Sequence, residues 1–257
     1  MIELKGIHKI YNAGTVNETC LFEDFNLTVQ DGDFVSVVGS NGSGKTSMLN
    51  IICGSIDTDA GSILIGGKDI TKEKDFKRYT RIGRVYQNPA MGTCASMTIL
   101  ENMALADNKG KPFGLQWGTN KKRISYYKEQ LAQLGLGLED KLEVKVGALS
   151  GGQRQAMALL MSTMTPIEFL ILDEHTAALD PKTADTIMEL TDKVVREKKL
   201  TTIMVTHNLR YAVEYGNRIL MMHQGKAILD KRDDEKAAVQ VDDLLHIFNQ
   251  ISIECGN

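Results

Sequence analysis

Short apolar runs rich in β-branched residues recur along this chain, and helical patterns separate several of them. A buried strand of a parallel sheet reads as a continuous apolar run, and the crossover to the next strand is usually a helix. The pattern therefore predicts an α/β fold with a mainly parallel core sheet. The predicted core strands are residues 34–38, 82–86, 169–172 and 201–205.

Three other segments differ because polar residues interrupt their apolar positions. Residues 2–10, 21–29 and 62–65 show this pattern, and glycines punctuate them. Such strands are typical of a sheet that leaves one face exposed. We expect them to form an antiparallel layer beside the core.

Between residues 88 and 149 the pattern becomes Met-rich, polar and helical. Residues 109–120, with several glycines and a proline, predict a loop within this stretch. We interpret 88–149 as a helical subdomain inserted into the core. One predicted helix carries apolar side chains at three- and four-residue spacing, namely Ile124, Tyr127, Leu131 and Leu134.

The last segment, residues 226–257, contains a charged run and then an amphipathic helix through Leu244, Leu245 and Phe248. We interpret it as a C-terminal extension and not as a further domain. A chain of 257 residues can bury a full core in one large domain without disulfides or metal.

Composition excludes several classes of function. The 30 basic and 33 acidic residues give a net charge of -3, so we expect no nucleic-acid partner. The longest unbroken apolar run, residues 156–161, is far shorter than the ~20 residues of a membrane-spanning helix. The four cysteines form no C-x-x-C pair and the chain shows no secretory leader, so reduced thiols are expected.

Residues 39–46 match the phosphate-loop pattern G-x-x-x-x-G-K-[ST], with a predicted strand before them and a helical run after them. The glycines let backbone N–H groups converge on phosphates, Lys45 adds a positive charge, and Thr46 offers a hydroxyl to Mg²⁺. The pattern indicates a P-loop NTPase core but does not separate kinases, GTPases and ATPases. The predicted nucleotide contacts are Gly39, Ser40, Asn41, Gly42, Ser43, Gly44, Lys45, Thr46 and Ser47.

Two acidic residues, Asp173 and Glu174, follow the predicted strand at 169–172. The carboxyl ends of parallel strands meet at one edge of a sheet, so we expect both acids near the γ-phosphate. Asp173 fits a carboxylate that holds Mg²⁺ or its waters. Glu174 fits a residue that polarises the attacking water, which favours hydrolysis over transfer. The alternative is a pair of acids that ends a strand without a catalytic role.

A second candidate anion site is the sequence Leu-Ser-Gly-Gly-Gln at 149–153, directly before a helical run. Ser150, Gly151 and Gly152 stand at the predicted helix N-terminus, whose partial positive charge suits a γ-phosphate. The alternative is an ordinary serine-capped helix.

In the order and spacing of its motifs the chain resembles the ATPase subunits of ABC transporters from Tyr11 to about Gly225. The resemblance implies a RecA-like core, formed by 1–87 and 150–225, that hydrolyses ATP with Mg²⁺. It also implies a head-to-tail homodimer. In this dimer the helix that follows the signature sequence Leu-Ser-Gly-Gly-Gln at 149–153, here called the signature helix, caps the ATP held by the opposite subunit. The motifs are the phosphate loop, Gln87, LSGGQRQ at 149–155, Asp173-Glu174, Ala178-Leu179-Asp180 and Thr206-His207.

The resemblance assigns roles to matching residues. Tyr11 resembles the aromatic residue that stacks on adenine, Gln87 the glutamine that reaches Mg²⁺, and His207 the histidine that contacts the γ-phosphate. Each has a structural alternative: a packed ring, a strand cap and a structural histidine. The implied catalytic residues are Lys45, Glu174 and His207, the metal ligands Thr46, Gln87 and Asp173, and the contacts across the dimer Ser150, Gly151, Gly152, Gln153 and Asp180.

One residue departs from the family pattern, because His175 stands where a proline usually follows the glutamate. A histidine restores a backbone N–H and frees φ, and its imidazole titrates near neutral pH. We expect His175 to be a tolerated variant with no catalytic part.

The resemblance further implies an integral-membrane permease as partner, an extracytoplasmic substrate-binding protein in the same system, and a position on the cytoplasmic face of a bacterial membrane. A lone ATPase domain is similar to the importer arrangement, and residues 173–181 are similar to ATPases of amino-acid importers, aromatic amino acids among them. Two alternatives stay open. One is a soluble ABC ATPase of iron–sulfur cluster assembly, and the other is a nucleotide-binding regulatory module that no longer hydrolyses ATP.

Overall fold

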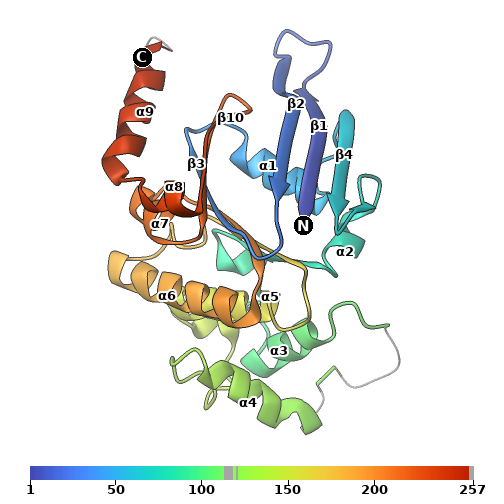
Figure 1. Ribbon diagram of the computed structural model, residues 1–257. Coiled ribbons are helices and arrows are strands. Elements are labelled where there is room, and N and C mark those ends of the chain that lie inside the picture. Colours follow the sequence, from blue (N-terminus) through green and yellow to red (C-terminus); the bar gives the residue numbers. More distant parts are fainter. Residues whose placement is uncertain (113–117, 120, 255–257) are drawn as a thin grey trace. The chain divides into compact units, whose positions relative to one another are not determined.

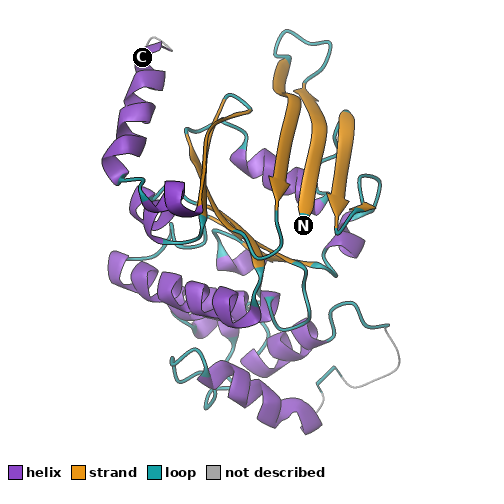
Figure 2. Cartoon of the chain, in the orientation of Figure 1, coloured by secondary structure: helices purple, strands orange, loops and turns teal. Residues whose placement is uncertain are grey.

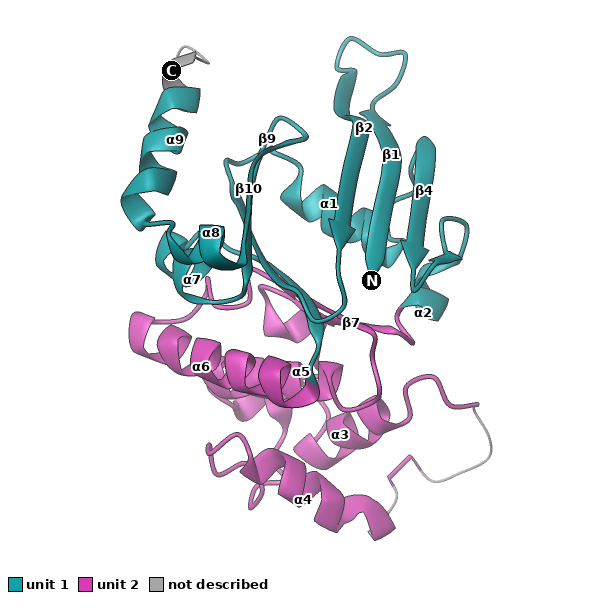
Figure 3. Cartoon of the chain, in the orientation of Figure 1, with its two compact units in different colours: residues 1–78, 199–257 teal, residues 79–198 magenta. Residues whose placement is uncertain are grey.

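Figure 1 shows the computed structural model, which describes residues 1–112, 118–119 and 121–254. Strands and helices alternate along much of the chain (Figure 2), which confirms the predicted α/β class. The chain forms two compact units (Figure 3), of which the first comprises residues 1–78 and 199–257 and the second residues 79–198.

The first unit contains a four-stranded antiparallel sheet in the order β2, β1, β4, β5. Leu4 on β1 lies opposite Leu27 on β2 and Ile63 on β4, and all three side chains are buried. The predicted antiparallel layer is thereby confirmed. Its strands are β1 (Ile2–Tyr11), β2 (Thr19–Val29), β4 (Ala60–Ile65) and the short β5 (Lys68–Asp69).

The first unit also contains the parallel strands β3, β8 and β9, with β3 paired to both of the others. Every residue of β3 is buried, as the continuous apolar run predicts. The sequence does not predict β9 or β10, because β9 holds one β-branched residue and β10 is largely polar; their hairpin pairing makes them strands. The strands are β3 (Phe34–Gly39), β8 (Thr201–Val205), β9 (Arg218–His223) and the antiparallel β10 (Lys226–Arg232).

The C-terminal segment of the first unit ends in the predicted amphipathic helix α9. Leu244 is fully buried in a cluster with Val38 of β3 and Ala212 of α7, whereas Leu245 is exposed. The extension is therefore packed onto the strands of this unit. The helices are α1 (Lys45–Cys53), α2 (Asp75–Arg78), α7 (Leu209–Glu214), α8 (Asp233–Ala237) and α9 (Val241–Glu254).

The second unit pairs two parallel strands and adds most of the long helices. Tyr127 and Leu131 of α4 are buried in its apolar core, as their spacing predicts. Of the predicted loop at 109–120, residues 113–117 and 120 lie outside the described part of the chain, and the others form neither helix nor strand. The elements are β6 (Ile82–Val85), β7 (Phe169–Asp173), α3 (Ile99–Asp107), α4 (Ile124–Ala132), α5 (Gly151–Ser162), α6 (Pro181–Lys198) and short 3-10 turns at Pro89–Met91, Lys121–Arg123 and Val146–Ala148.

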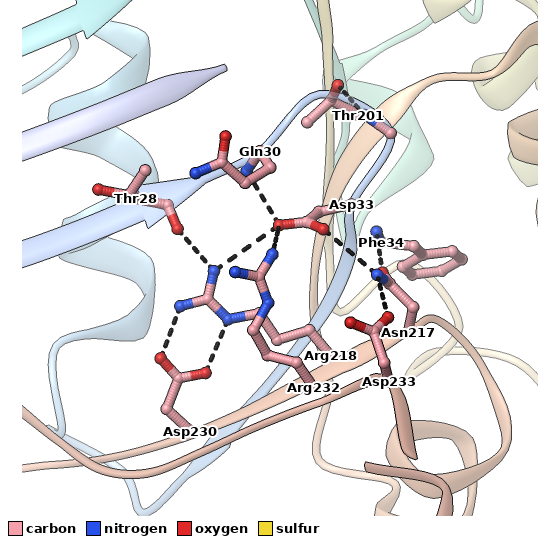
Figure 4. A network of polar contacts seen from close by, with 11 residues as sticks. Thr28, Gln30, Asp33, Phe34, Thr201, Asn217, Arg218, Asp230, Arg232 and Asp233 are labelled. Atoms are coloured by element: carbon pink, nitrogen blue, oxygen red, sulfur yellow. Dashed lines mark hydrogen bonds and ion pairs between the residues drawn. The ribbon is translucent and has the colours of Figure 1, made fainter. Parts of the chain in front are cut away.

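A network of charges around the buried pair Arg218 and Asp33 joins the turn before β3 to β9 and β10 (Figure 4). The guanidinium of Arg218 donates two hydrogen bonds to Asp230, at 2.7 and 2.6 Å, and one to the carbonyl of Thr28. It also lies 3.8 Å from Asp33, whose other cationic partner is Arg232 at 2.7 Å. The network satisfies a charge that the packing of these strands would otherwise leave buried and unpaired.

Replacing Arg218 by Met should lower the free energy of unfolding by about 3 kcal/mol, because Asp33 keeps its buried charge and loses one of two cations. Urea unfolding followed by circular dichroism measures the change. Lys231→Met on β10 is the matched control, since its ion pair with Glu235 is exposed and should be worth less than about 1 kcal/mol. Equal losses in the two variants would contradict this account of the network.

Candidate functional site

The loop between β3 and α1 needs glycine at two places where other parts of the first unit approach it closely. A Cβ on Gly39 would lie 2.2 Å from the carbonyl oxygen of Met222. A Cβ on Gly44, whose φ is +104°, would lie 2.8 Å from the ring of Phe22. The fold around the loop therefore forces its backbone into a tight turn that only glycine allows.

Lys45 lies within the curve of this loop and is only 5% exposed. Its Nζ donates hydrogen bonds to the carbonyl of Gly39 at 2.7 Å and to that of Ser40 at 2.9 Å. The ammonium group thus ties the start of α1 to the end of β3. It also places a positive charge inside the loop. This arrangement suits a bound phosphate.

Two predicted nucleotide contacts outside the loop lie beside it in the same unit. The hydroxyl of Tyr11 donates to Ser47 Oγ at 3.2 Å, so the ring lies near the first turn of α1. His207 follows β8, is exposed, and lines a cavity of about 290 Å³ together with Gly39, Ser40 and Asn41. The predicted residues Tyr11 and His207 are therefore brought to the loop.

Three residues at this loop were not predicted from the sequence. The N–H of Gly225, in the turn between β9 and β10, donates to the carbonyl of Ser43 at 3.0 Å. His223 Nδ1 lies 3.5 Å from Ser40 Oγ, and Phe248 of α9 lines the cavity with His207. No local pattern marks these positions, because only the pairing of β9 and the packing of α9 bring them to the loop.

The two carboxylates stand at the end of β7 in the second unit. Asp173 is the last residue of the strand, and its Oδ2 accepts a hydrogen bond from Arg84 Nη2 at 2.7 Å. Glu174 adopts a φ of +49°, an uncommon conformation for a residue with a side chain. The chain thus turns sharply after Asp173.

Arg84 is a site residue that sequence reasoning missed. It lies on β6, next to β7, and its side chain is only 6% exposed. The signal was present, because an arginine interrupts the apolar run Ile-Gly-Arg-Val-Tyr at residues 82–86. Charged residues are rarely buried without a partner, so the run itself indicates a carboxylate nearby.

Gln87 follows β6 and is exposed. The carbonyl of the preceding residue, Tyr86, accepts a hydrogen bond from Gln155 Nε2 of α5 at 3.1 Å. The backbone before Gln87 is thereby tied to the helix that carries the signature sequence.

His175 points away from the carboxylates and into the packing of α6. Its Nε2 lies 3.1 Å from Thr191 Oγ1, and that hydroxyl donates to the carbonyl of Ile187 at 2.7 Å. Because the hydroxyl proton is used, Nε2 carries a proton and donates to Thr191. Complete burial lowers the pKa of His175 to about 4, so the ring is neutral at physiological pH.

The signature sequence forms the N-terminus of α5 with a capping box. The Ser150 hydroxyl accepts from the N–H of Gln153 at 3.2 Å, and the Gln153 side chain accepts from the N–H of Ser150 at 3.1 Å. The first amides of the helix, those of Gly151 and Gly152, have no intrahelical acceptor by geometry. A Cβ on Gly152 would lie 2.4 Å from Thr183 Cγ2 of α6, so this glycine also serves packing.

Asp180 has a structural part as well, because its Oδ1 accepts from the N–H of Thr183 at 3.1 Å in the first turn of α6. Hydrogen bonds from Thr183 lower the pKa of Asp180. The structure thus shows Ser150, Gln153 and Asp180 capping the starts of α5 and α6. Their contacts across a dimer stay predictions.

Within the described residues, no three His, Cys, Asp or Glu side chains cluster into a metal site. Mg²⁺ prefers oxygen ligands and commonly keeps several waters. Thr46, Gln87 and Asp173 offer a hydroxyl, an amide oxygen and a carboxylate, and the first two are exposed. Each of these groups is an oxygen donor of the kind that Mg²⁺ prefers. The search for membrane-spanning segments, confined to the described residues, finds no helix of sufficient length and apolarity.

Comparison with known proteins adds the family. The model of the ABC transporter family matches residues 22–177. The tyrosine transport ATP-binding protein of Clostridioides difficile (strain R20291) is 44% identical over 248 residues, which cover 96% of this chain and 98% of the relative. A phosphonates import ATP-binding protein of Lactobacillus gasseri is 32% identical and covers 95% of this chain, with 92% of its own length matched.

Among solved structures, the dimeric ATP-binding cassette MJ0796, in a post-hydrolysis state bound to ADP and phosphate, matches with a TM-score of 0.76. It is 30% identical, and the match covers 90% of this chain and 98% of that one.

The buried imidazole makes stability depend on pH. The unfolded chain protonates His175 near pH 6.5 and the folded chain only near pH 4. The free energy of unfolding should therefore fall by up to about 3 kcal/mol as the pH drops through this window, and this contribution is fully present above it. Urea unfolding without nucleotide, measured from pH 7.5 to 4, tests this.

His175→Gln keeps a donor for Thr191 but cannot titrate, so its stability should fall less over the same window. His246→Gln, at an exposed position on α9, is the matched control and should keep the pH dependence of the original chain. A wild-type pH dependence in His175→Gln would refute the buried neutral state.

Proposed function

Since this chain belongs to the ABC transporter family as an ATP-hydrolysing, ATP-binding subunit, we propose that it powers bacterial import of a small solute through a membrane permease. The observation that carries the proposal is the glycine-constrained loop closed around Lys45. Such a loop binds the β- and γ-phosphates of a nucleoside triphosphate through its amides and its lysine.

We propose separate roles for the residues around the phosphates. The loop amides and Lys45 bind the phosphates, Tyr11 stacks on adenine, and His207 contacts the γ-phosphate. Glu174 polarises the attacking water, and its sharp turn after Asp173 supports a separate task for each carboxylate. Thr46, Gln87 and Asp173 hold Mg²⁺, which when bound offsets the charge of the phosphates.

We propose that the working form is a head-to-tail homodimer. The N-terminus of α5 carries the positive end of a helix and two glycine amides, a combination suited to an anion. Within one subunit, the amides of the phosphate loop and Lys45 already bind the γ-phosphate. The N-terminus of α5 therefore contacts the ATP that is bound to a second copy of the chain. The contacting residues are Ser150, Gly151, Gly152 and Gln153, and Asp180 links the two ATP sites. The dimeric state named for the solved relative supports this assembly.

We propose an amino acid as cargo, with aromatic amino acids favoured. The support is the tyrosine transport relative, which matches nearly the full length of both chains at 44% identity. The permease and an extracytoplasmic binding protein would choose the cargo, and this subunit would lie on the cytoplasmic face of the membrane. Purification from solubilised membranes, with identification of the co-purified chains, distinguishes this assembly from iron–sulfur scaffold partners.

Replacing Glu174 by Gln should abolish ATP turnover and leave Mg-ATP binding within about twofold, since the amide cannot accept the proton of the attacking water. Phosphate release and binding of a fluorescent ATP analogue measure the two properties separately. Lys45→Ala is the contrasting variant and should lose binding as well as turnover, by roughly 10²-fold or more in rate. Wild-type turnover in Glu174→Gln would sink the catalytic assignment. Phosphate release from the original chain tests the regulatory alternative separately, because a module that no longer hydrolyses ATP would release none.

The dimer is tested in the Glu174→Gln background, where bound ATP persists. Adding Mg-ATP should convert monomer to dimer in analytical ultracentrifugation. Ser150→Asp should prevent this conversion, because aspartate still caps α5 but repels the γ-phosphate. Thr98→Asp makes a similar change in the capping box of α3 and should dimerise normally. If both variants dimerise equally, the signature helix does not contact the ATP of the partner subunit.

A further inference from the structure

We infer that Arg84 is a positioning residue that fixes the Asp173 carboxylate and competes with the divalent cation for it. The inference rests on the proposed function, in which Asp173 holds Mg²⁺. Arg84 Nη2 donates to Asp173 Oδ2 at 2.7 Å, and the two side chains are 6% and 13% exposed. Such a shielded ion pair is far less screened by water and salt than a surface pair.

The guanidinium is held by more than its ion pair. Its carbon lies 4.6 Å from the ring centre of Tyr86, which is within the range of a cation–π contact. The hydroxyl of Tyr86 is 3.2 Å from that of Tyr79, and the carbonyl of Tyr86 accepts from Gln155. The Arg84 guanidinium therefore contacts both the Asp173 carboxylate and the Tyr86 ring. Tyr86 is in turn fixed through its hydroxyl and through its backbone carbonyl.

The position of Arg84 in the sheet makes the pairing geometrically firm. In the parallel register of β6 and β7, Arg84 lies opposite Ile171, two residues before Asp173. Side chains two residues apart share a face of a strand, so the arginine needs only to extend along β7 to reach the carboxylate. Neither strand has to distort to make the contact.

This arrangement has two opposite effects on a cation bound at Asp173. The arginine occupies Oδ2 and holds the plane of the carboxylate, which leaves Oδ1 oriented for a metal ion or one of its waters. Its positive charge also repels a divalent cation bound to the same group. Arg84 should therefore lower the affinity for the cation while raising the fraction of carboxylates in one orientation.

The two effects predict that loss of Arg84 changes cation affinity and turnover in opposite directions. A simple loss of structure would lower both. Without Arg84, the cation should bind Asp173 about five- to tenfold more tightly, because the competing charge is gone. Turnover at saturating cation should fall about tenfold, because the carboxylate is free to rotate. A merely structural arginine would, when lost, weaken cation binding and turnover together.

The test measures Mn²⁺ as a probe for Mg²⁺, using the electron paramagnetic resonance signal of free Mn²⁺ at saturating ATP. Arg84→Met and Arg84→Gln are compared with the original residue in the full chain carrying Glu174→Gln, so that ATP is not consumed. Arg84→Lys keeps the charge and should restore most of the weaker affinity. Turnover and the Mg²⁺ concentration for half-maximal rate are then measured with Glu174 intact.

Arg81→Met is the matched control, because Arg81 directly precedes β6 and pairs with Glu168 at 3.9 Å instead of Asp173. It should leave the Mn²⁺ affinity unchanged. Tighter Mn²⁺ binding in both Arg84→Met and Arg84→Gln supports the inference, and unchanged or weaker binding in either folded variant overturns it. If the parent chain itself binds no Mn²⁺ with ATP, the proposed function fails, and the inference falls with it.

Discussion

The tight turn after β3 depends on a positive charge enclosed by backbone carbonyls. Lys45 is buried because its Nζ donates to the carbonyls of Gly39 and Ser40, and those carbonyls face inward because the glycine backbone permits it. A buried ammonium without such acceptors would cost several kcal/mol. The surrounding elements are shaped to this turn: Phe22 of β2 and the carbonyl of Met222 on β9 both leave room only for glycine.

Buried cations with assigned partners recur in both units. In the first unit, Arg218 joins the turn before β3 to β9 and β10 through Asp33 and Asp230. In the second, Arg84 joins β6 to Asp173. Each arginine lies on a strand and reaches a carboxylate on a neighbouring segment. The first pairing connects strands of the first unit, whereas the second engages the residue proposed to hold Mg²⁺.

His175 shows how burial can remove a titratable group from a site that lies close in sequence. It follows Glu174 directly, yet its ring packs against α6 and donates to Thr191. Burial lowers the pKa of the imidazole to about 4, so the ring is neutral near pH 7 and carries no charge beside the carboxylates. The helix caps of Ser150 and Asp180 make a related point, since residues of a functional motif can also hold the ends of the helices that present them.

Elements whose pattern or chemistry is local could be predicted from the amino-acid order alone. The buried strands β3, β6, β7 and β8 follow from their apolar runs, α4 and α9 from their periodicity, and the phosphate loop from glycine and lysine spacing. The family follows from the order of these motifs, because a motif is a contiguous string of residues.

Features that depend on pairing and packing between distant segments could be found only in the folded chain. β9 is a strand because it pairs with β3 and β10, and β10 because it pairs with β9; their composition does not decide it. His223, Gly225 and Phe248 reach the phosphate loop only through that pairing and through the packing of α9. Likewise the partner of Arg84 is set by the register of β6 against β7, since parallel strands far apart in sequence carry no local signal of which residues will meet.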